Sequence, residues 1–309
     1  MEENFPARRN KFAVNSIFWR RAIDWLAGHL PAPFHRPLIW TAACVFLLIA
    51  TPARRGLLSN LKLIRPRSLR FANYARVLRV FVNFGWSLTD SAIYRMFHPR
   101  FRYELERSRY LDQLAAAKSA IVLTAHIGNY DLGAALFAER FDRRIKMVRA
   151  PESDALTAKH VRDTLEKSTG GAVAVGYSDR GTSLAFDLLS ALRTGEIISI
   201  QGDRVVGDVG RAPVKFCGRE ILLPNGPFIL SLVSETPIYP LFIVRTGHRK
   251  YKIVAREPIL CARTNLSRDE AIASSMQRWA DVLHEITSVY WPQWFAFVPL
   301  ERSPSCSDA

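Results

Sequence analysis

The residues best suited to chemistry lie in the segment VLTAHIGNYDLG, at positions 122–133. A run of small and branched apolar residues, typical of a buried strand, ends at His126, and Asp131 follows five positions later. On one continuous helix, this separation would turn the two side chains to different faces. They can meet if His126 ends a strand and Asp131 lies in the first turn of the next helix. The sequence favours this arrangement, because Gly128 permits a sharp turn and Asn129 is a good helix N-cap.

A histidine and an aspartate placed in this way indicate general base catalysis. The neutral imidazole of His126 would take a proton from an incoming hydroxyl, while Asp131 would hold the other ring nitrogen and stabilise the imidazolium that forms. A purely structural interpretation is also open, in which the histidine caps the strand and the aspartate favours the helix dipole. The spacing alone does not decide between the two.

The rest of the chain alternates between short apolar runs and longer helical patterns. Strand–helix–strand spacing of this kind predicts an α/β fold with a mostly parallel central sheet flanked by helices. The apolar runs typical of buried strands are residues 119–125, 144–150, 172–176, 196–202 and 237–244. The helical patterns are residues 129–141, 153–168, 182–193, 225–234 and 268–290. Two more runs, 214–223 and 251–259, have the pattern of peripheral or edge strands.

An uncharged apolar run stands near the N-terminus. Residues 38–50 contain no charged side chain, and Arg36, Arg54 and Arg55 flank them. A bilayer crossing needs roughly 18 to 20 such residues, so this run is short for a complete span. It predicts a membrane-embedded or interfacial anchor, with a buried core helix as the alternative. The preceding residues 15–30 have the pattern of a basic amphipathic helix, which also suits a membrane surface.

These patterns divide the chain into parts. We expect N-terminal membrane-associating helices over residues 1–53, an α/β catalytic domain over residues 54–300, and a disordered tail over residues 301–309.

The charge of the chain indicates a polyanionic partner. The 309 residues carry a formal net charge of +15, and residues 54–109 alone hold 13 basic side chains against three acidic ones. Nucleic acid, anionic lipid headgroups or an acidic protein would all suit such a surface. Because the basic segment adjoins the apolar run and contains no known nucleic-acid-binding motif, we expect an anionic membrane surface and no nucleic acid.

Other kinds of site are not indicated. The sequence has no P-loop and no dinucleotide-binding fingerprint, and GYSDRG at 176–181 has one residue too many for a nucleophile elbow. The four cysteines show no ligand spacing. We therefore expect neither a cofactor nor a metal site.

Several motifs together resemble the bacterial lipid A biosynthesis (lauroyl/myristoyl) acyltransferases, a branch of the lysophospholipid acyltransferase superfamily. HIGNYD at 126–131 is similar to the H-x4-D/E motif of that superfamily, in the form H-x-G-N-[WY]-[DE]. Five other segments resemble the family's pattern in the expected order: NLKLIRP (60–66), MVRAPES (147–153), QGDR (201–204), VKFCGREILLPNGPFILSLVSETPIYPLFIV (214–244) and WPQWFAF (291–297). The likeness spans roughly residues 55–297, although Asp131 stands where glutamate is commoner in the family.

The resemblance implies transfer of a fatty acyl group from an acyl carrier protein thioester, or from acyl-CoA, to a hydroxyl of a lipid acceptor. A lipid A precursor or a related glycolipid or aminolipid would be such an acceptor, at the cytoplasmic side of the inner membrane. His126 would be the general base and Asp131 would orient it, with no covalent acyl-enzyme.

Five further residues are implied in substrate binding. Arg149 and Arg204 follow strands at the same sheet edge, where each guanidinium could hold a phosphate or a carboxylate. Asp203 would pair with Arg204 or with another base. Gly128 and Asn129 would shape the turn, and their backbone N–H groups are candidate donors to the oxyanion.

Two other function classes remain open at this point. One is a basic α/β protein that binds nucleic acid or an anionic membrane without catalysis. The other is a lipid hydrolase or thioesterase that uses the same histidine and aspartate with water.

Overall fold

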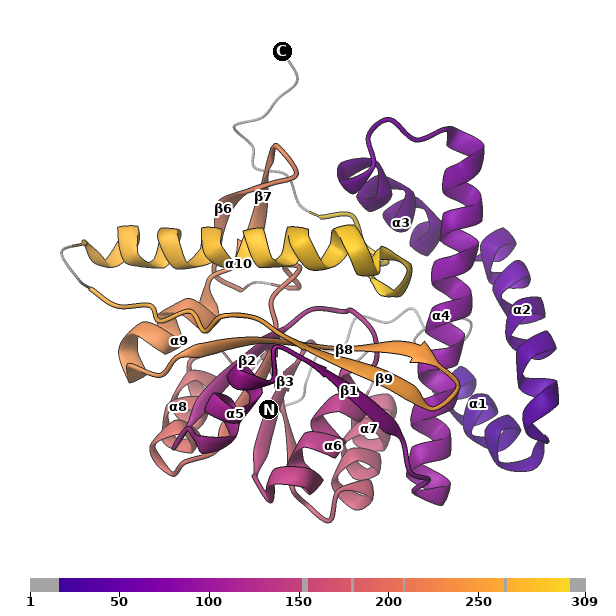
Figure 1. Cartoon of the computed structure of the whole chain (residues 1–309), viewed down its shortest axis with the longest axis horizontal. Coiled ribbons are helices and arrows are strands. Elements are labelled where there is room, and N and C mark those ends of the chain that lie inside the picture. Colours follow the sequence, from indigo (N-terminus) through magenta and orange to yellow (C-terminus); the bar gives the residue numbers. More distant parts are fainter. Residues whose placement is uncertain (1–16, 152–154, 179–180, 208, 264–265, 301–309) are drawn as a thin grey trace.

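The central feature of the fold is a sheet with helices on both faces (Figure 1). The computed structural model describes residues 17–151, 155–178, 181–207, 209–263 and 266–300. Within these ranges the main sheet has seven strands in the order β1-β9-β8-β2-β5-β3-β4, and β6 and β7 form a separate two-stranded sheet. The predicted α/β class is therefore confirmed.

The sheet is mostly parallel. Strands β8, β2, β5, β3 and β4 run in one direction, whereas β9 is antiparallel to β8 and pairs in parallel with β1. The strand bounds are β1 (Arg102–Glu106), β2 (Ala120–Thr124), β3 (Ile145–Arg149), β4 (Val173–Tyr177), β5 (Ile197–Gln201), β6 (Arg211–Phe216), β7 (Arg219–Pro224), β8 (Ile238–Gly247) and β9 (Lys250–Ala255).

The structure treats the two predicted peripheral strands, residues 214–223 and 251–259, differently. Residues 214–223 are peripheral, as expected, but they form the hairpin of β6 and β7. The expectation of a peripheral strand at 251–259 is wrong, because β9 lies between β8 and β1. Strand β1, which the sequence did not indicate, covers the edge that β9 would otherwise leave open.

Helices cover both faces of the sheet because its central strand is apolar on both sides. In β2, Ile121 and Leu123 face the core shared with α8, α9 and α10, and Ala120 and Val122 face the core shared with α5, α6 and α7. The helix bounds are α5 (Ser108–Ala116), α6 (Tyr130–Phe141), α7 (Ala155–Ser168), α8 (Gly181–Arg193), α9 (Gly226–Ser234) and α10 (Arg268–Tyr290).

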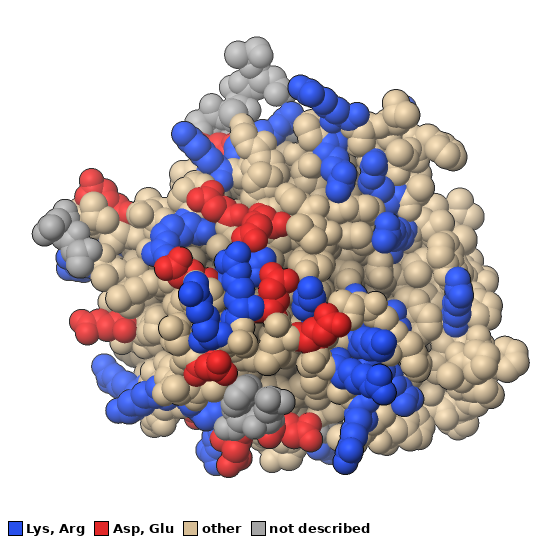
Figure 2. Space-filling model, viewed as in Figure 1, with Lys and Arg blue, Asp and Glu red and all other residues tan. Residues whose placement is uncertain are grey.

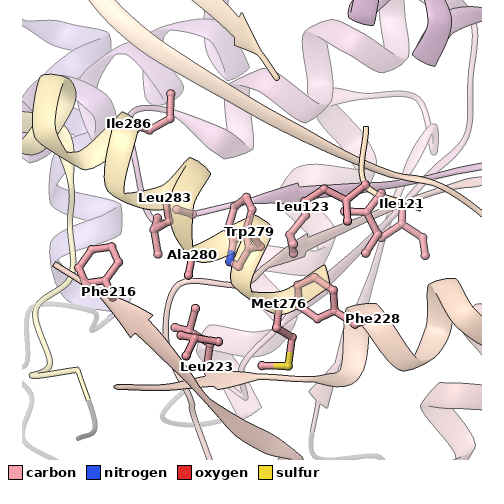
Figure 3. Close-up of a cluster of buried hydrophobic side chains, with 14 of the residues drawn as sticks. Ile121, Leu123, Phe216, Leu223, Phe228, Met276, Trp279, Ala280, Leu283 and Ile286 are labelled. Carbon is pink, nitrogen blue, oxygen red and sulfur yellow. The ribbon is translucent and has the colours of Figure 1, made fainter. Parts of the chain in front are cut away.

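Helix α10 has the predicted bounds and the predicted packing stripe (Figure 3). It begins with a capping box between Ser267 and Glu270, which satisfies N–H groups of the first turn. Trp279 is fully buried in the middle of the stripe and stacks on Phe242, with ring centroids 5.9 Å apart. Its indole N–H donates to the Gly202 carbonyl over 2.9 Å, so α10 supports the backbone directly before Asp203.

In the described part of the chain, four helices lie at the N-terminal end: α1 (Ile17–His29), α2 (Ala32–Ile49), α3 (Thr51–Ile64) and α4 (Arg70–Phe97). The sequence did not predict the long helix α4, against which the other three pack. Figure 1 shows α4 between α2 and the main sheet, with α1 and α3 against it, in agreement with the element contacts. The expected boundary between residues 53 and 54 falls inside α3, and the expected disordered tail, 301–309, lies outside the described residues.

Residues 296–300 of the C-terminal segment pack closely against α3. A Cβ on Gly56 would lie 2.0 Å from the Phe297 carbonyl oxygen, so only glycine lets α3 approach this closely. Asn60 donates to the carbonyls of Ala296 and Val298 and accepts from the backbone N–H of Leu300. Helix α3 is thus held against the segment that follows α10.

The support that α10 gives to the backbone before Asp203 can be measured. Trp279→Ala should lower the free energy of unfolding by about 3–5 kcal/mol, because it removes a fully buried ring and leaves the Gly202 carbonyl without its donor. Trp279→Phe keeps most of the buried ring, so it should lower the free energy of unfolding clearly less than Trp279→Ala does. Denaturant unfolding followed by circular dichroism measures both variants. A loss below about 1 kcal/mol for Trp279→Ala would contradict this role.

Candidate active site

A tight turn presents His126 at the carboxyl end of β2. Gly128 has a φ of +65°, and a Cβ there would lie 1.8 Å from the Ile243 carbonyl oxygen, so the turn requires glycine. The backbone N–H of Gly128 donates to the Gln293 carbonyl over 2.9 Å, and that of Asn129 donates to the Ile243 carbonyl over 3.0 Å. Strand β8 and the C-terminal segment therefore fix the turn from two sides.

Asn129 is the N-cap of α6, as predicted. Its side-chain oxygen accepts from the backbone N–H of Leu132 and from the Ser91 hydroxyl, and its amide donates to the Ser87 carbonyl over 3.0 Å. Ser87 and Ser91 belong to α4. The same asparagine thus starts α6, places Asp131 in its first turn and joins the turn to α4.

The carboxylate beside His126 is Asp203. The Nδ1 atom of His126 lies 2.7 Å from Oδ1 of Asp203, and the Trp294 indole N–H donates to Oδ2 over 2.9 Å. Strand register explains this contact. Thr124 pairs with Gln201 in the parallel strands β2 and β5. His126 lies two residues after Thr124, and Asp203 lies two residues after Gln201, so the two side chains come out at the same level. Because an ionised carboxylate only accepts hydrogen bonds, we assign the imidazole proton to Nδ1.

The second ring nitrogen faces Arg204. Its Nη2 lies 3.1 Å from Nε2 of His126. A guanidinium only donates, so Nε2 accepts and carries a lone pair. The hydrogen-bond pattern therefore corresponds to the neutral imidazole, with its basic nitrogen toward the guanidinium. The His126 side chain keeps 14% of its surface exposed.

Asp203 is ionised although it is fully buried. Burial alone would raise its pKa, but the electrostatic interaction and the hydrogen bond with His126, together with Arg204 and Trp294, lower the pKa from 3.8 to about 2. The buried carboxylate is thus a fixed negative charge that accepts the hydrogen bond from Nδ1.

Asp131 does not contact His126 in the structure. It accepts from Arg149 instead, with 2.6 Å between Oδ1 and Nη1. Two causes account for the difference from the expected pair. Asp203 already takes Nδ1 of His126, and the guanidinium of Arg149, only 9% exposed, needs a carboxylate nearby. The predicted placement of both residues is therefore found, but the orienting contact belongs to Asp203.

The expected oxyanion donors are already engaged. The backbone N–H groups of Gly128 and Asn129 donate to protein carbonyls, so they do not point to a substrate oxygen in this arrangement. Their role here is to shape the turn. Arg204 is the remaining expected residue beside the histidine, and its Nε atom is buried without a hydrogen-bond partner among the described residues.

Trp294 is a site residue that sequence reasoning did not identify. It lies in WPQWFAF, where the family resemblance drew attention to the segment but gave no role to the indole. Residues 152 and 153 of MVRAPES lie outside the described residues. In the part of the chain that is described, no group of three or more His, Cys, Asp or Glu side chains is arranged to hold a metal ion.

Two hollows adjoin the turn. A cavity of about 480 Å³ lies between α6 and the sheet, and its walls are mainly apolar, with Val122, Ala134 and Phe137 among them. A smaller cleft of about 80 Å³ lies between α1, α4, α7 and the start of α6. Tyr130 lines both, and its ring lies edge-on to His126 with centroids 5.8 Å apart.

The buried charge of Asp203 predicts a pH effect on stability. Folding lowers the pKa of Asp203, so this residue adds to the free energy of unfolding. Its contribution is full above the ordinary pKa of 3.8 and is lost as the pH falls through about 2. Trp294→Phe removes one donor to Asp203, so folding should lower the pKa of Asp203 less, and the loss of stability should be smaller and should end at a higher pH. Urea unfolding at pH values across this window measures the effect, with Asp203→Asn as the control that lacks the titrating group. Identical profiles for the wild type and Asp203→Asn would contradict it.

Comparison with known proteins gives one family. A family model of bacterial lipid A biosynthesis acyltransferases matches residues 7–300, nearly the whole chain. A comparison with individual curated proteins gives no match. Proteins of the matched family are acyltransferases and are associated with membranes. The resemblance carried by the sequence motifs is thus confirmed, and the chain belongs to the family of bacterial lipid A biosynthesis acyltransferases.

Proposed function

We propose that this chain transfers a fatty acyl group from an acyl carrier protein thioester, or from acyl-CoA, to a hydroxyl of a membrane lipid. The acceptor is a lipid A precursor or a related glycolipid or aminolipid. The observation that carries the proposal is the pair of His126 and Asp203, in which a buried carboxylate holds Nδ1 and leaves the lone pair on Nε2. This is the arrangement that a general base needs.

The reaction proceeds by direct attack. The acceptor hydroxyl binds at Nε2 of His126, its oxygen bonds to the thioester carbonyl carbon, and its proton passes to Nε2. Asp203 stabilises the resulting imidazolium. The tetrahedral intermediate then collapses with cleavage of the C–S bond, and the imidazolium returns the proton to the departing sulfur. Atoms balance without a covalent acyl-enzyme.

Arg204 serves the negative oxygen of that intermediate. Its guanidinium lies 3.1 Å from Nε2, so it is within reach of whatever reacts there. The acceptor hydroxyl takes its place at Nε2, and the guanidinium then donates to the former carbonyl oxygen. Because the N–H groups of Gly128 and Asn129 are engaged elsewhere, Arg204 is the best-placed donor for this charge.

Asp131 acts on the site through Arg149. The ion pair joins the first turn of α6 to the end of β3, beside the ring of Tyr130. We propose that this ion pair positions the substrate, with Arg149 directed toward a phosphate or carboxylate of the substrate. The proton transfer itself depends on His126 and Asp203.

The cavity of about 480 Å³ accommodates the acyl chain. Its volume is in the range of ~300–1,000 Å³ that is usual for small-molecule sites, and its walls are mainly apolar. Thr124 and Tyr130, on either side of His126 in the sequence, both line it. An acyl chain in this cavity would lie against Thr124 and Tyr130, the two cavity residues that flank His126 in the sequence.

The positive surface suits both macromolecular partners. Figure 2 shows Lys and Arg side chains gathered near α3 and the upper part of α4. Acyl carrier protein is acidic and the inner leaflet is anionic, so one basic surface serves both by electrostatic attraction. We place the enzyme at the cytoplasmic side of the inner membrane, held by its N-terminal helices.

Substitutions at the histidine and the two carboxylates test the assignment. We predict that His126→Ala and Asp203→Asn each lower kcat roughly 100-fold or more, because they remove the base or its orienting charge. Asp131→Asn should mainly raise KM for the acceptor. Turnover with acyl-acyl carrier protein and a lipid A precursor measures these effects, and circular dichroism checks the fold.

The outcomes separate the alternatives. Near-normal turnover by His126→Ala would contradict the base, and a larger fall in kcat for Asp131→Asn than for Asp203→Asn would give the orienting role to Asp131. Release of free fatty acid without acyl-lipid would identify a hydrolase that uses water as the acceptor.

The acyl cavity gives a separate prediction about chain length. Ala134 lies on α6 in the cavity wall and is buried. Ala134→Phe should fill part of the space and shift the preferred donor toward shorter acyl chains, whereas Ala134→Ser should leave the preference unchanged. Competition between donors of different length, followed by mass spectrometry of the acyl-lipid, measures the shift. An unchanged preference in a folded, active Ala134→Phe enzyme would show that the acyl chain binds outside this cavity.

A further inference from the structure

Helix α2 is apolar on two opposite sides. Its inner side is buried on α4 through Ile39 and Ala43. Its outer side is exposed, with 59% of Phe34 and 73% of Leu48 accessible. A surface helix of a water-soluble domain normally has polar residues on its outer side, so this surface requires another explanation.

The exposed apolar residues form one continuous stripe. Phe34, Leu38, Thr41, Val45 and Leu48 follow each other at three or four positions, which places them on one helix face. Thr41 is the polar member, and its hydroxyl donates to the Pro37 carbonyl within the helix over 3.0 Å. The stripe therefore offers an apolar medium no unsatisfied side-chain group. The helix of 18 residues is about 27 Å long.

By length and composition, α2 could cross a membrane, and within the described ranges it is the helix that meets this criterion. Its packing argues against a crossing. A Cβ on Gly85 of α4 would lie 2.8 Å from Cγ2 of Ile39, so the two helices approach closely. At the far end, Arg54 donates to the carbonyls of Leu47 and Leu48 and so ends α2 in a protein contact.

Helix α4 could not follow α2 into a bilayer. Phe81 of α4 packs on Phe297 as well as on Phe46 of α2, and Phe84 of α4 packs on Phe295. Asp90, also on α4, is buried and accepts from Arg245 and Tyr251 of the catalytic sheet. A crossing α2 would have to leave α4 or carry this charged helix and the attached domain into the hydrocarbon.

We propose that α2 lies flat in the membrane interface without crossing the bilayer, with its outer stripe toward the acyl chains. This inference rests on the proposed function, because a lipid acceptor gives the enzyme a bilayer to meet. The exposed Arg36 and Arg55, near the two ends of α2, face anionic headgroups in this pose. Figure 2 agrees: the side of the molecule at α1 and α2 shows few charged side chains, with Lys and Arg beside it.

The flat pose brings the catalytic turn to the bilayer. Helix α1, which precedes α2 directly, supplies Ile23 and Asp24 to the cleft of about 80 Å³ beside Gly128 and Asn129. Trp25 on α1 is 60% exposed, as expected for an aromatic ring at a membrane interface. We place the acceptor headgroup in this cleft, next to the turn at Gly128 and Asn129, while its acyl chains stay in the membrane.

Sidedness of labelling tests the pose in the full chain. His29→Cys and Arg55→Cys, each in a background with the four native cysteines changed to serine, are treated with a membrane-impermeant maleimide in right-side-out and inverted membrane vesicles. A flat α2 predicts that both positions label from the same side. Labelling of the two positions from opposite sides would show a crossing helix and overturn the proposal.

Depth measurements identify what covers the stripe. Fluorophores at Leu38, Val45 and Leu48 should lose most of their emission to nitroxide lipids in phosphatidylethanolamine–phosphatidylglycerol vesicles, while one at Arg219, on a distant hairpin, should not. Arg36→Gln and Arg55→Gln should each weaken binding to these vesicles roughly fivefold and leave binding to phosphatidylcholine vesicles nearly unchanged. Absence of quenching with a stable dimer would assign the stripe to a second copy and overturn the proposal.

The same experiments on His126→Ala separate this inference from the proposed reaction. Because the pose needs no catalysis, labelling and quenching should be unchanged in that variant. Loss of acyl transfer with a normal pose would bear on the reaction alone, and a crossing helix in a fully active enzyme would bear on the pose alone.

Discussion

The contact between the imidazole of His126 and the buried carboxylate of Asp203 is the interaction on which the other features of the site depend. A charge can stay buried at this position because Trp294 and His126 donate to it and because the guanidinium of Arg204 lies nearby. Trp279 fixes the backbone just before Asp203. The parallel register of β2 with β5 places the side chains of His126 and Asp203 next to each other. The proposed base is thus positioned by the core of the protein and not by a mobile loop.

Helix α4 joins two parts of the molecule that face different surroundings. One side of it carries α2, whose outer stripe we assign to lipid, and the other side holds the catalytic turn through Ser87 and Ser91. Asp90 connects the same helix to β8 and β9. In the proposed arrangement, one rigid element sets both the orientation of the enzyme on a bilayer and the position of His126, so a lipid substrate would arrive at a fixed depth relative to the proposed base.

The sequence predicted local features well and distant partners poorly. The strand that ends at His126, the turn at Gly128, the N-cap Asn129 and the bounds of α10 follow from short-range patterns, and the structure contains them. The contact of His126 with Asp203 joins residues 77 positions apart. Spacing favoured the nearer Asp131, because sequence patterns carry no information on strand register. Helix α4 was missed since its stripe is interrupted by buried polar residues such as Asn73 and Asp90.

Nitrogen-15 NMR of the imidazole of His126 tests the central claim most directly, because it reports which ring nitrogen carries the proton. In the resting enzyme at neutral pH, we expect the proton on Nδ1, an unprotonated Nε2, and a Nδ1 proton signal that moves strongly upfield in Asp203→Asn. A proton on Nε2 alone, or a spectrum that Asp203→Asn leaves unchanged while Asp131→Asn alters it, would contradict the account.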